Sequence, residues 1–123
     1  MRLTPEEWVR QQLLHRLVEE LHYPGSRIGV EVPLEKLSVV QSNGTTAQRV
    51  DAVIYDRTMK PQILIECKAE TVPLTQKTLD QAVTYNRKLG VPYLLLHNGL
   101  QSVFVDLRSE TPAFSAAIPA FEG

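Results

Sequence analysis

The sequence predicts a single α/β domain in which a helix, a meander of strands, a second helix and a strand hairpin follow one another. Three observations predict it. The chain has 123 residues, 43% of them apolar, which suffices for one hydrophobic core but not for a second domain. Two segments carry apolar residues at helical spacing. The segments around them alternate or are continuously apolar, as strands are.

Charge and cysteine content exclude several classes of protein. Lys and Arg number 13 against 14 Asp and Glu, and this net charge of -1 argues against a strongly cationic nucleic-acid coat. The single cysteine, Cys67, cannot form an internal disulfide, and the first residues lack the apolar stretch of a signal peptide. No run approaches the roughly 18 apolar residues of a membrane span. We therefore expect a cytoplasmic protein that makes no membrane contact.

The first element is a helix that begins at Thr4-Pro5-Glu6-Glu7. This segment combines an N-cap hydroxyl, a proline at the first helical position and a capping-box glutamate. The helix continues through one apolar stripe, formed by Val9, Leu13, Leu14, Leu17, Val18 and Leu21. Tyr23-Pro24-Gly25 ends it, and the stripe must pack against another layer.

A meander of strands follows this helix. The first strand is predicted over Arg27–Leu34 and a second, short one over Leu37–Val40. Asn43-Gly44 is the strongest hairpin signal of the chain. Beyond it, Arg49–Tyr55 and Gln62–Lys68 are predicted to be antiparallel neighbours joined by a turn.

The second half of the chain repeats the change from helix to strands. Apolar residues at helical spacing predict a helix over Thr75–Leu89. The strand Val91–His97, the tight turn Asn98-Gly99 and the strand Gln101–Leu107 make a hairpin. Prolines among small residues predict that Ser109–Gly123 is an irregular tail.

Two carboxylates and an ammonium group are predicted to converge where two of these strands meet. Asp51 lies in one strand, and Glu66 and Lys68 share a face of the next, because strand side chains alternate. Carboxylates suit Mg²⁺ or Mn²⁺. A metal held by Asp51, Glu66 and the Cys67 carbonyl would ionise a water and polarise a phosphate. Lys68 would orient or deprotonate that water.

The same residues also have a purely structural interpretation. Both carboxylates emerge from apolar segments, and a buried charge needs a partner, so Lys68 could simply pair with Glu66 or Asp51. Glu-x-Lys spacing is common in itself. The Cys67 thiol, on the opposite strand face, is interpreted as a small core filler.

The motifs and their order resemble those of a known family. Three segments resemble the D…ExK and QxxxY motifs of PD-(D/E)XK nucleases: Arg49-Val50-Asp51-Ala52-Val53, Ile65-Glu66-Cys67-Lys68-Ala69 and Gln81-Ala82-Val83-Thr84-Tyr85. Three others resemble the N-terminal domain family of type I restriction enzyme R subunits: Pro5-Glu6-Glu7-Trp8-Val9-Arg10-Gln11, Val91-Pro92-Tyr93 and Asn98-Gly99. The resemblance implies a restriction-endonuclease-like α/β core of order α-β-β-β-α-β, with a mixed central sheet flanked by helices.

The resemblance also implies an activity and its residues. Residues 1–108 would form a nuclease domain that hydrolyses DNA phosphodiester bonds with Mg²⁺ or Mn²⁺. Asp51 and Glu66 would be metal ligands together with the Cys67 carbonyl. Lys68 would be the catalytic lysine. The alternative is a nucleic-acid-binding or assembly module that keeps the fold without catalysis.

Three further residues receive a role from the resemblance. Gln81 and Tyr85, one helical turn apart, would contact a phosphate or base, although a solvated helix face with Tyr85 half-buried also fits. Glu7 matches the first-helix glutamate that completes metal binding, and a capping-box role fits it equally well. The expected partners are DNA, a separate motor or specificity protein, and a second copy of the chain.

Overall fold

The structure is a computed structural model that describes residues 3–37 and 49–122. Two α-helices and six strands make up the regular structure of these residues, with two short 3₁₀ helices beside the first strand. In chain order the elements are α1 (Pro5–Glu19), η1 (Gly25–Arg27), β1 (Ile28–Pro33), η2 (Leu34–Lys36), β2 (Arg49–Tyr55), β3 (Pro61–Cys67), α2 (Gln76–Arg87), β4 (Tyr93–His97), β5 (Ser102–Asp106) and β6 (Ala113–Ser115).

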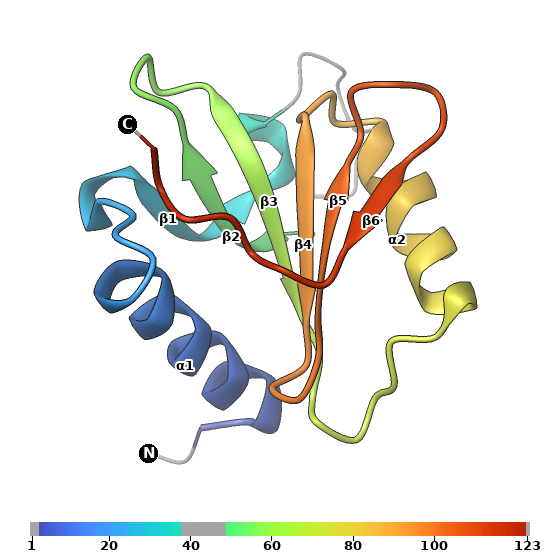
Figure 1. Cartoon of the computed structure of the whole chain (residues 1–123). Coiled ribbons are helices and arrows are strands. Elements are labelled where there is room, and N and C mark those ends of the chain that lie inside the picture. Colours follow the sequence, from blue (N-terminus) through green and yellow to red (C-terminus); the bar gives the residue numbers. More distant parts are fainter. Residues whose placement is uncertain (1–2, 38–48, 123) are drawn as a thin grey trace.

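The six strands form one mixed sheet whose spatial order, β1-β2-β3-β4-β5-β6, follows the chain (Figure 1). Neighbours are antiparallel except β3 and β4, which run parallel and are connected through α2. Parallel neighbours need such a crossover, because the chain must return to the sheet end where it started. The C-terminal ends of β3 and β4 therefore lie side by side, with Cys67 opposite His97.

The sheet separates two apolar cores, and each of them contains residues of one helix. The core that contains Val9, Leu13 and Leu17 of α1 is called the α1-side core. The core that contains Leu79, Ala82 and Val83 of α2 is called the α2-side core. Strand β3 supplies both in alternation. Ile63, Ile65 and Cys67 belong to the α1-side core and Leu64 to the α2-side core.

Both helices begin at threonine N-caps, as expected for Thr4 from the sequence. Thr4 Oγ1 accepts a hydrogen bond from the Glu7 amide at 3.1 Å, and Thr75 Oγ1 accepts one from the Thr78 amide at 3.2 Å. These bonds satisfy amide groups that have no partner inside the helix. The predicted order of helix, strands, helix and strands is confirmed, with a sheet of mixed direction.

Two sequence predictions fall where the structure is silent or adds an element. The short strand predicted over Leu37–Val40 and the Asn43-Gly44 turn lie outside the described residues, apart from Leu37, which follows η2. The tail predicted as irregular contains the short strand β6, which pairs with β5. Ile118, further along the tail, is buried in the α1-side core. In the described residues, neither helix has the length and apolar character needed to cross a membrane.

Candidate active site

The C-terminal end of β3 presents the predicted Glu66 and Lys68. Leu64, two residues before Glu66, packs in the α2-side core, so alternation places Glu66 and Lys68 on that side of the sheet. The Lys68 amide donates to the His97 carbonyl at 2.8 Å, which extends the ladder between β3 and β4 beyond Cys67. Both side chains are half-buried at the sheet end.

Asp51 is joined directly to this end of β3. Its Oδ2 accepts a hydrogen bond from the Cys67 amide at 2.7 Å, across the pair formed by β2 and β3. The residues on either side of Asp51 pack in different cores, Val50 on the α2 side and Ala52 on the α1 side. Regular alternation would place these two residues on one face, so the strand is turned locally at Asp51. The carboxylate therefore reaches sideways to the next strand.

Strand β1 is distorted at the same level of the sheet. Glu31 lies opposite Asp51, between the paired residues Val30 and Val32, and has a left-handed φ of 52°. A residue with a Cβ adopts this conformation only at an energetic cost. Ile28 then packs against the α1-side core and Val32 in the α2-side core, so β1 changes face together with β2. Such strain is common at functional sites, and here it lies beside the predicted one.

Like charges gather around Glu66. Burial raises the pKa of its carboxyl group; the positive charge of Lys68 lowers it, while the negative charges of Asp51 and Glu6 raise it further. The net direction is upward, so the lysine does not compensate for burial and repulsion. In the described residues, no ion pair within 4.0 Å joins Lys68 to Asp51 or Glu66. The closed ion pair of the structural interpretation is therefore not formed.

The two neighbouring glutamates of α1 have different surroundings. Glu7 is engaged in the capping box, where its Oε1 accepts a hydrogen bond from the Thr4 hydroxyl at 3.1 Å. Glu6 is the helix glutamate whose negative charge acts on Glu66 and Cys67. The sequence analysis named Glu7 and not Glu6, and a metal-binding role of Glu7 stays a prediction. The spacing along the helix could have indicated Glu6. It lies seven positions, or about two helical turns, before the buried Leu13, so both residues are on the same side of α1.

Cys67 is a structural residue, as interpreted from its position. Its side chain is 3% exposed and belongs to the α1-side core. Burial, together with nearby negative charge, raises the pKa of its thiol to about 12. A thiol with this pKa is protonated at neutral pH and is neither a nucleophile nor a metal ligand. The backbone of Cys67 is the part that faces the candidate site, through its amide bonded to Asp51.

Helix α2 places Tyr85 near the same carboxylates. Tyr85 is 42% exposed, and burial of its hydroxyl together with the negative charge of Glu66 raises its pKa. The exposed Gln81 lies one turn earlier, and Ala82 and Val83 turn toward the core. The exposed face that carries Gln81 and Tyr85 is therefore beside Glu66, whose negative charge acts on the Tyr85 hydroxyl.

A buried amide holds the segment that follows Lys68. Asn98, in the turn between β4 and β5, is 2% exposed. Its Nδ2 donates to the Val72 carbonyl at 2.8 Å, and its Oδ1 accepts from the amides of Leu100 and Gln101 at 2.9 and 2.7 Å. One side chain thus ties the β4–β5 turn to the loop between β3 and α2. The Asn98-Gly99 motif has a structural function at this end of the sheet.

The donors fit a hard divalent cation only in part. Asp51 and Glu66 are oxygen ligands of the kind Mg²⁺ prefers, and repulsion between them is relieved by a cation. In residues 3–37 and 49–122, however, no three His, Cys, Asp or Glu side chains are placed to hold a metal together. Two carboxylates, a backbone carbonyl and water molecules remain as the ligand set, which is within the range Mg²⁺ accepts.

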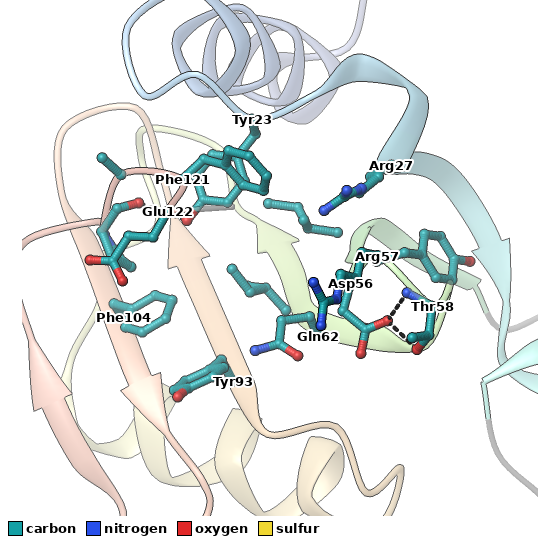
Figure 2. A pocket seen from close by; sticks show the side chains of 15 residues that line it. Tyr23, Arg27, Asp56, Arg57, Thr58, Gln62, Tyr93, Phe104, Phe121 and Glu122 are labelled. Atoms are coloured by element: carbon teal, nitrogen blue, oxygen red, sulfur yellow. Dashed lines mark hydrogen bonds between the residues drawn. The ribbon is translucent and has the colours of Figure 1, made fainter.

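A hollow lies at the other end of the sheet. It has a volume of about 520 Å³ and is bounded by the β2–β3 turn, the start of β4 and the tail (Figure 2). Its aromatic rings already contact other side chains. The guanidinium carbon of Arg27 lies 5.3 Å from the centroid of the Phe121 ring. The Tyr93 ring stacks on Phe104, and the Arg108 guanidinium lies over the same Tyr93 ring. The hollow contains none of the predicted site residues.

Comparison with known proteins places the chain in a family. The fold resembles a fragment structure of a protein assigned as the HsdR subunit of a type I restriction enzyme from Vibrio vulnificus YJ016. The TM-score is 0.64 at 22% identity, over 98% of this chain and 24% of that one. No curated protein matches the chain in sequence. The family model of the type I restriction enzyme R protein N terminus (HSDR_N) matches residues 5–119. The chain therefore belongs to the family of type I restriction enzyme R protein N-terminal domains.

Proposed function

We propose that the domain is a metal-dependent nuclease of the PD-(D/E)XK type that hydrolyses DNA phosphodiester bonds. One observation carries the proposal. The hydrogen bond from the Cys67 amide to Asp51 Oδ2, 2.7 Å long, joins the aspartate motif to the Glu-x-Lys motif at one sheet end. Family membership supports the same conclusion, because the type I restriction enzyme R protein is the context in which this domain occurs.

Each residue has a stated part in the proposed reaction. Asp51 and Glu66, with the Cys67 carbonyl, would hold Mg²⁺ or Mn²⁺, and the bound metal would supply an activated water and neutralise charge on the phosphate. Lys68 would orient the attacking water or hold its proton. Gln81 and Tyr85 would contact the DNA strand from α2. Glu6, whose charge acts on Glu66, is a better placed helix carboxylate than Glu7.

The partners belong to the same proposal. The chain spans 24% of the length of the HsdR-like protein it resembles, so motor and specificity functions would come from other parts or other subunits. We propose association with DNA and with further subunits of a type I restriction system. Pairing of two copies, which would allow both strands to be cut, stays a prediction.

Cleavage assays test the catalytic part. Supercoiled, linear and single-stranded DNA are incubated with Mg²⁺ or Mn²⁺ and with wild-type protein, Asp51→Ala or Lys68→Ala from identical preparations. The matched controls are Asp80→Ala on α2 and Lys60→Ala in the turn between β2 and β3, which remove exposed side chains of the same types. We expect cleavage by the wild type and both controls, and a loss of about 10²-fold or more in the two site variants.

The other outcomes separate the remaining interpretations. Equal cleavage by all five proteins identifies a contaminant. DNA binding without cleavage, with Asp51→Ala binding as well as the wild type, favours the non-catalytic binding module. A melting temperature that rises with Mg²⁺ in the wild type and not in Asp51→Ala supports the metal site independently of turnover.

A further inference from the structure

One cation beside the candidate site has no part in the roles assigned above. Arg10 lies on α1, one turn after Glu6, and its side chain is only 14% exposed. Its Nη1 contacts Glu31 Oε1 at 3.3 Å. Glu31 is the strained residue opposite Asp51. The positive charge of Arg10 also acts on Cys67, the residue whose amide is bonded to Asp51, so the guanidinium lies near this bonded pair.

The hydrogen bonding of Arg10 is incomplete. Its Nε is buried and has no hydrogen-bond partner. A guanidinium has five N–H donors, and a buried donor without an acceptor costs free energy. The one ion pair is long for a charge-assisted hydrogen bond, and the side chain of Glu31 is 57% exposed. Glu31 is thus a weak partner that another anion can replace.

Charge in this region favours an additional role for Arg10. Four carboxylates, those of Glu6, Glu31, Asp51 and Glu66, lie around two cations, Arg10 and Lys68. A DNA phosphate is repelled by such a surplus. A divalent metal would balance this surplus and leave no net positive charge to attract the phosphate. A planar guanidinium that can bind a phosphate with two parallel hydrogen bonds is the complementary group.

We propose that Arg10 binds a phosphate of the DNA strand at this site and exchanges its contact with Glu31 for hydrogen bonds to phosphate oxygens. The inference rests on the proposed function, because it assumes that DNA enters at the Asp51 and Glu66 end of the sheet. Glu31 then holds the guanidinium in place while no DNA is bound. A purely structural Arg10 would instead serve only to tie α1 to β1.

The two roles differ in how DNA affinity responds to salt. Binding of a labelled duplex is measured by fluorescence anisotropy at several salt concentrations, in the Lys68→Ala background so that the duplex is not cut. Arg10→Met removes the phosphate contact. We expect about tenfold weaker binding and a fall of about 0.9 in the slope of log K against log salt, the effect of one lost contact. Arg10→Lys keeps the charge, so the slope stays and the affinity falls less.

Two further variants separate binding from stability. Glu31→Gln removes only the competing carboxylate, so we expect its DNA affinity to be retained or to increase, unlike that of Arg10→Met. If Arg10 is purely structural, the two variants should instead change DNA affinity and melting temperature in the same way, because each removes the same contact. Arg16→Met is the matched control, because Arg16 lies on the same helix in an exposed pair with Glu20, 4.0 Å apart. It should leave the slope unchanged. Melting temperatures are recorded for every variant, and Arg10→Gln, which also removes the charge, replaces Arg10→Met if the latter does not fold.

The failures of the two proposals are distinguishable. Wild-type protein that neither binds nor cuts DNA overturns the proposed function and this inference together. Wild-type binding combined with an unchanged salt slope and affinity in Arg10→Met overturns the inference alone. A lowered melting temperature with unchanged DNA binding identifies Arg10 as a structural tie between α1 and β1.

Discussion

At the scale of single residues, the chemistry proposed for this domain depends on how three strands meet. Asp51 bonds the backbone of Cys67, and the strained Glu31 lies on its other side. Burial and the neighbouring carboxylates raise the pKa of the Glu66 carboxyl group. Buried like charges without a closed ion pair are typical of sites that bind a cation. Two predictions follow from the electrostatics of Glu66 and Cys67.

Replacing Glu66 by Gln should stabilise the protein at pH 8. The folded state raises the pKa of Glu66, so the wild type loses stability as the pH rises through that pKa, and the amide avoids this loss. We expect the melting temperature of Glu66→Gln to exceed that of the wild type by about 2–5 °C at pH 8. The difference should shrink as the pH falls toward the ordinary range of glutamate.

Thermal melts between pH 4 and pH 8, without divalent metal, check this. The control is Glu110→Gln, an exposed glutamate outside the cluster. A variant less stable than the wild type at pH 8 would show that Lys68 depends on Glu66 as an ion-pair partner.

The Cys67 thiol should not react in the folded protein. Its pKa of about 12 leaves almost no thiolate at pH 8, and its side chain is buried against α1. We expect no modification by a disulfide reagent within an hour in native buffer, and complete modification in denaturant. Absorbance of the released thiol measures both. Rapid reaction in native buffer would contradict the burial of this side chain.

At the scale of elements, the candidate site is held where β3 and β4 end together. The parallel pairing of these strands places their C-terminal ends side by side. Helix α2, which connects the two strands along the chain, covers the sheet face that carries Glu66 and Lys68. The loop after Lys68 is held through the bonds of Asn98 to Val72 and to the following turn. The position of Lys68, at the end of β3, thus depends on the side chain of Asn98 in the hairpin formed by β4 and β5.

Asn98→Ala should therefore affect both stability and activity. Removal of the side chain leaves the Val72 carbonyl and two turn amides without partners, at a cost of about 2–3 kcal/mol in the free energy of unfolding. Urea denaturation measures this loss. Gln101→Ala, an exposed neighbour in the same turn, is the control and should change stability by less than about 0.5 kcal/mol. An equal loss in both variants would show that the amide of Asn98 has no special role.

At the scale of the whole molecule, the sheet is covered on both faces, and the tail completes the α1 side. Tyr23 donates a hydrogen bond to the Pro119 carbonyl at 2.7 Å, and the Phe121 amide donates to the Leu21 carbonyl at 2.9 Å. Ile118 fills the α1-side core between these bonds. Figure 1 shows the tail crossing the sheet toward the first helix and β1. The tail is therefore a structural part of the domain.

Truncation of Ile118 tests this. Ile118 is 9% exposed, and Ile118→Ala should lower the free energy of unfolding by about 2–4 kcal/mol through lost burial and an unfilled cavity. Leu100→Ala, at a side chain that is 73% exposed, should change it by less than about 0.5 kcal/mol. Chemical denaturation compares the two. A change in Ile118→Ala as small as that in Leu100→Ala would mean that the tail is not packed in solution.

The sequence alone was sufficient for both helices, for the strands β1 to β5 and for part of the site, but not for β6. Periodicity and caps predicted both helices, and the segment Arg49–Tyr55 coincides with β2. The proximity of Asp51 to the Glu-x-Lys segment was also predicted, because a hairpin places two adjacent strands side by side and their hydrophobic pattern restricts the register. These properties depend on neighbours in the chain, whose spacing is visible in the sequence.

Other features were decided only by the tertiary structure. The turn of the strands at Glu31 and Asp51, the effect of the Glu6 charge on Glu66, and the contact of Arg10 with Glu31 depend on how α1 lies over three strands. The burial of Ile118 depends on a tail that returns to the first helix. The physical reason is the same in each case. Local sequence determines backbone propensity, whereas side-chain surroundings are set by packing between segments far apart in the chain.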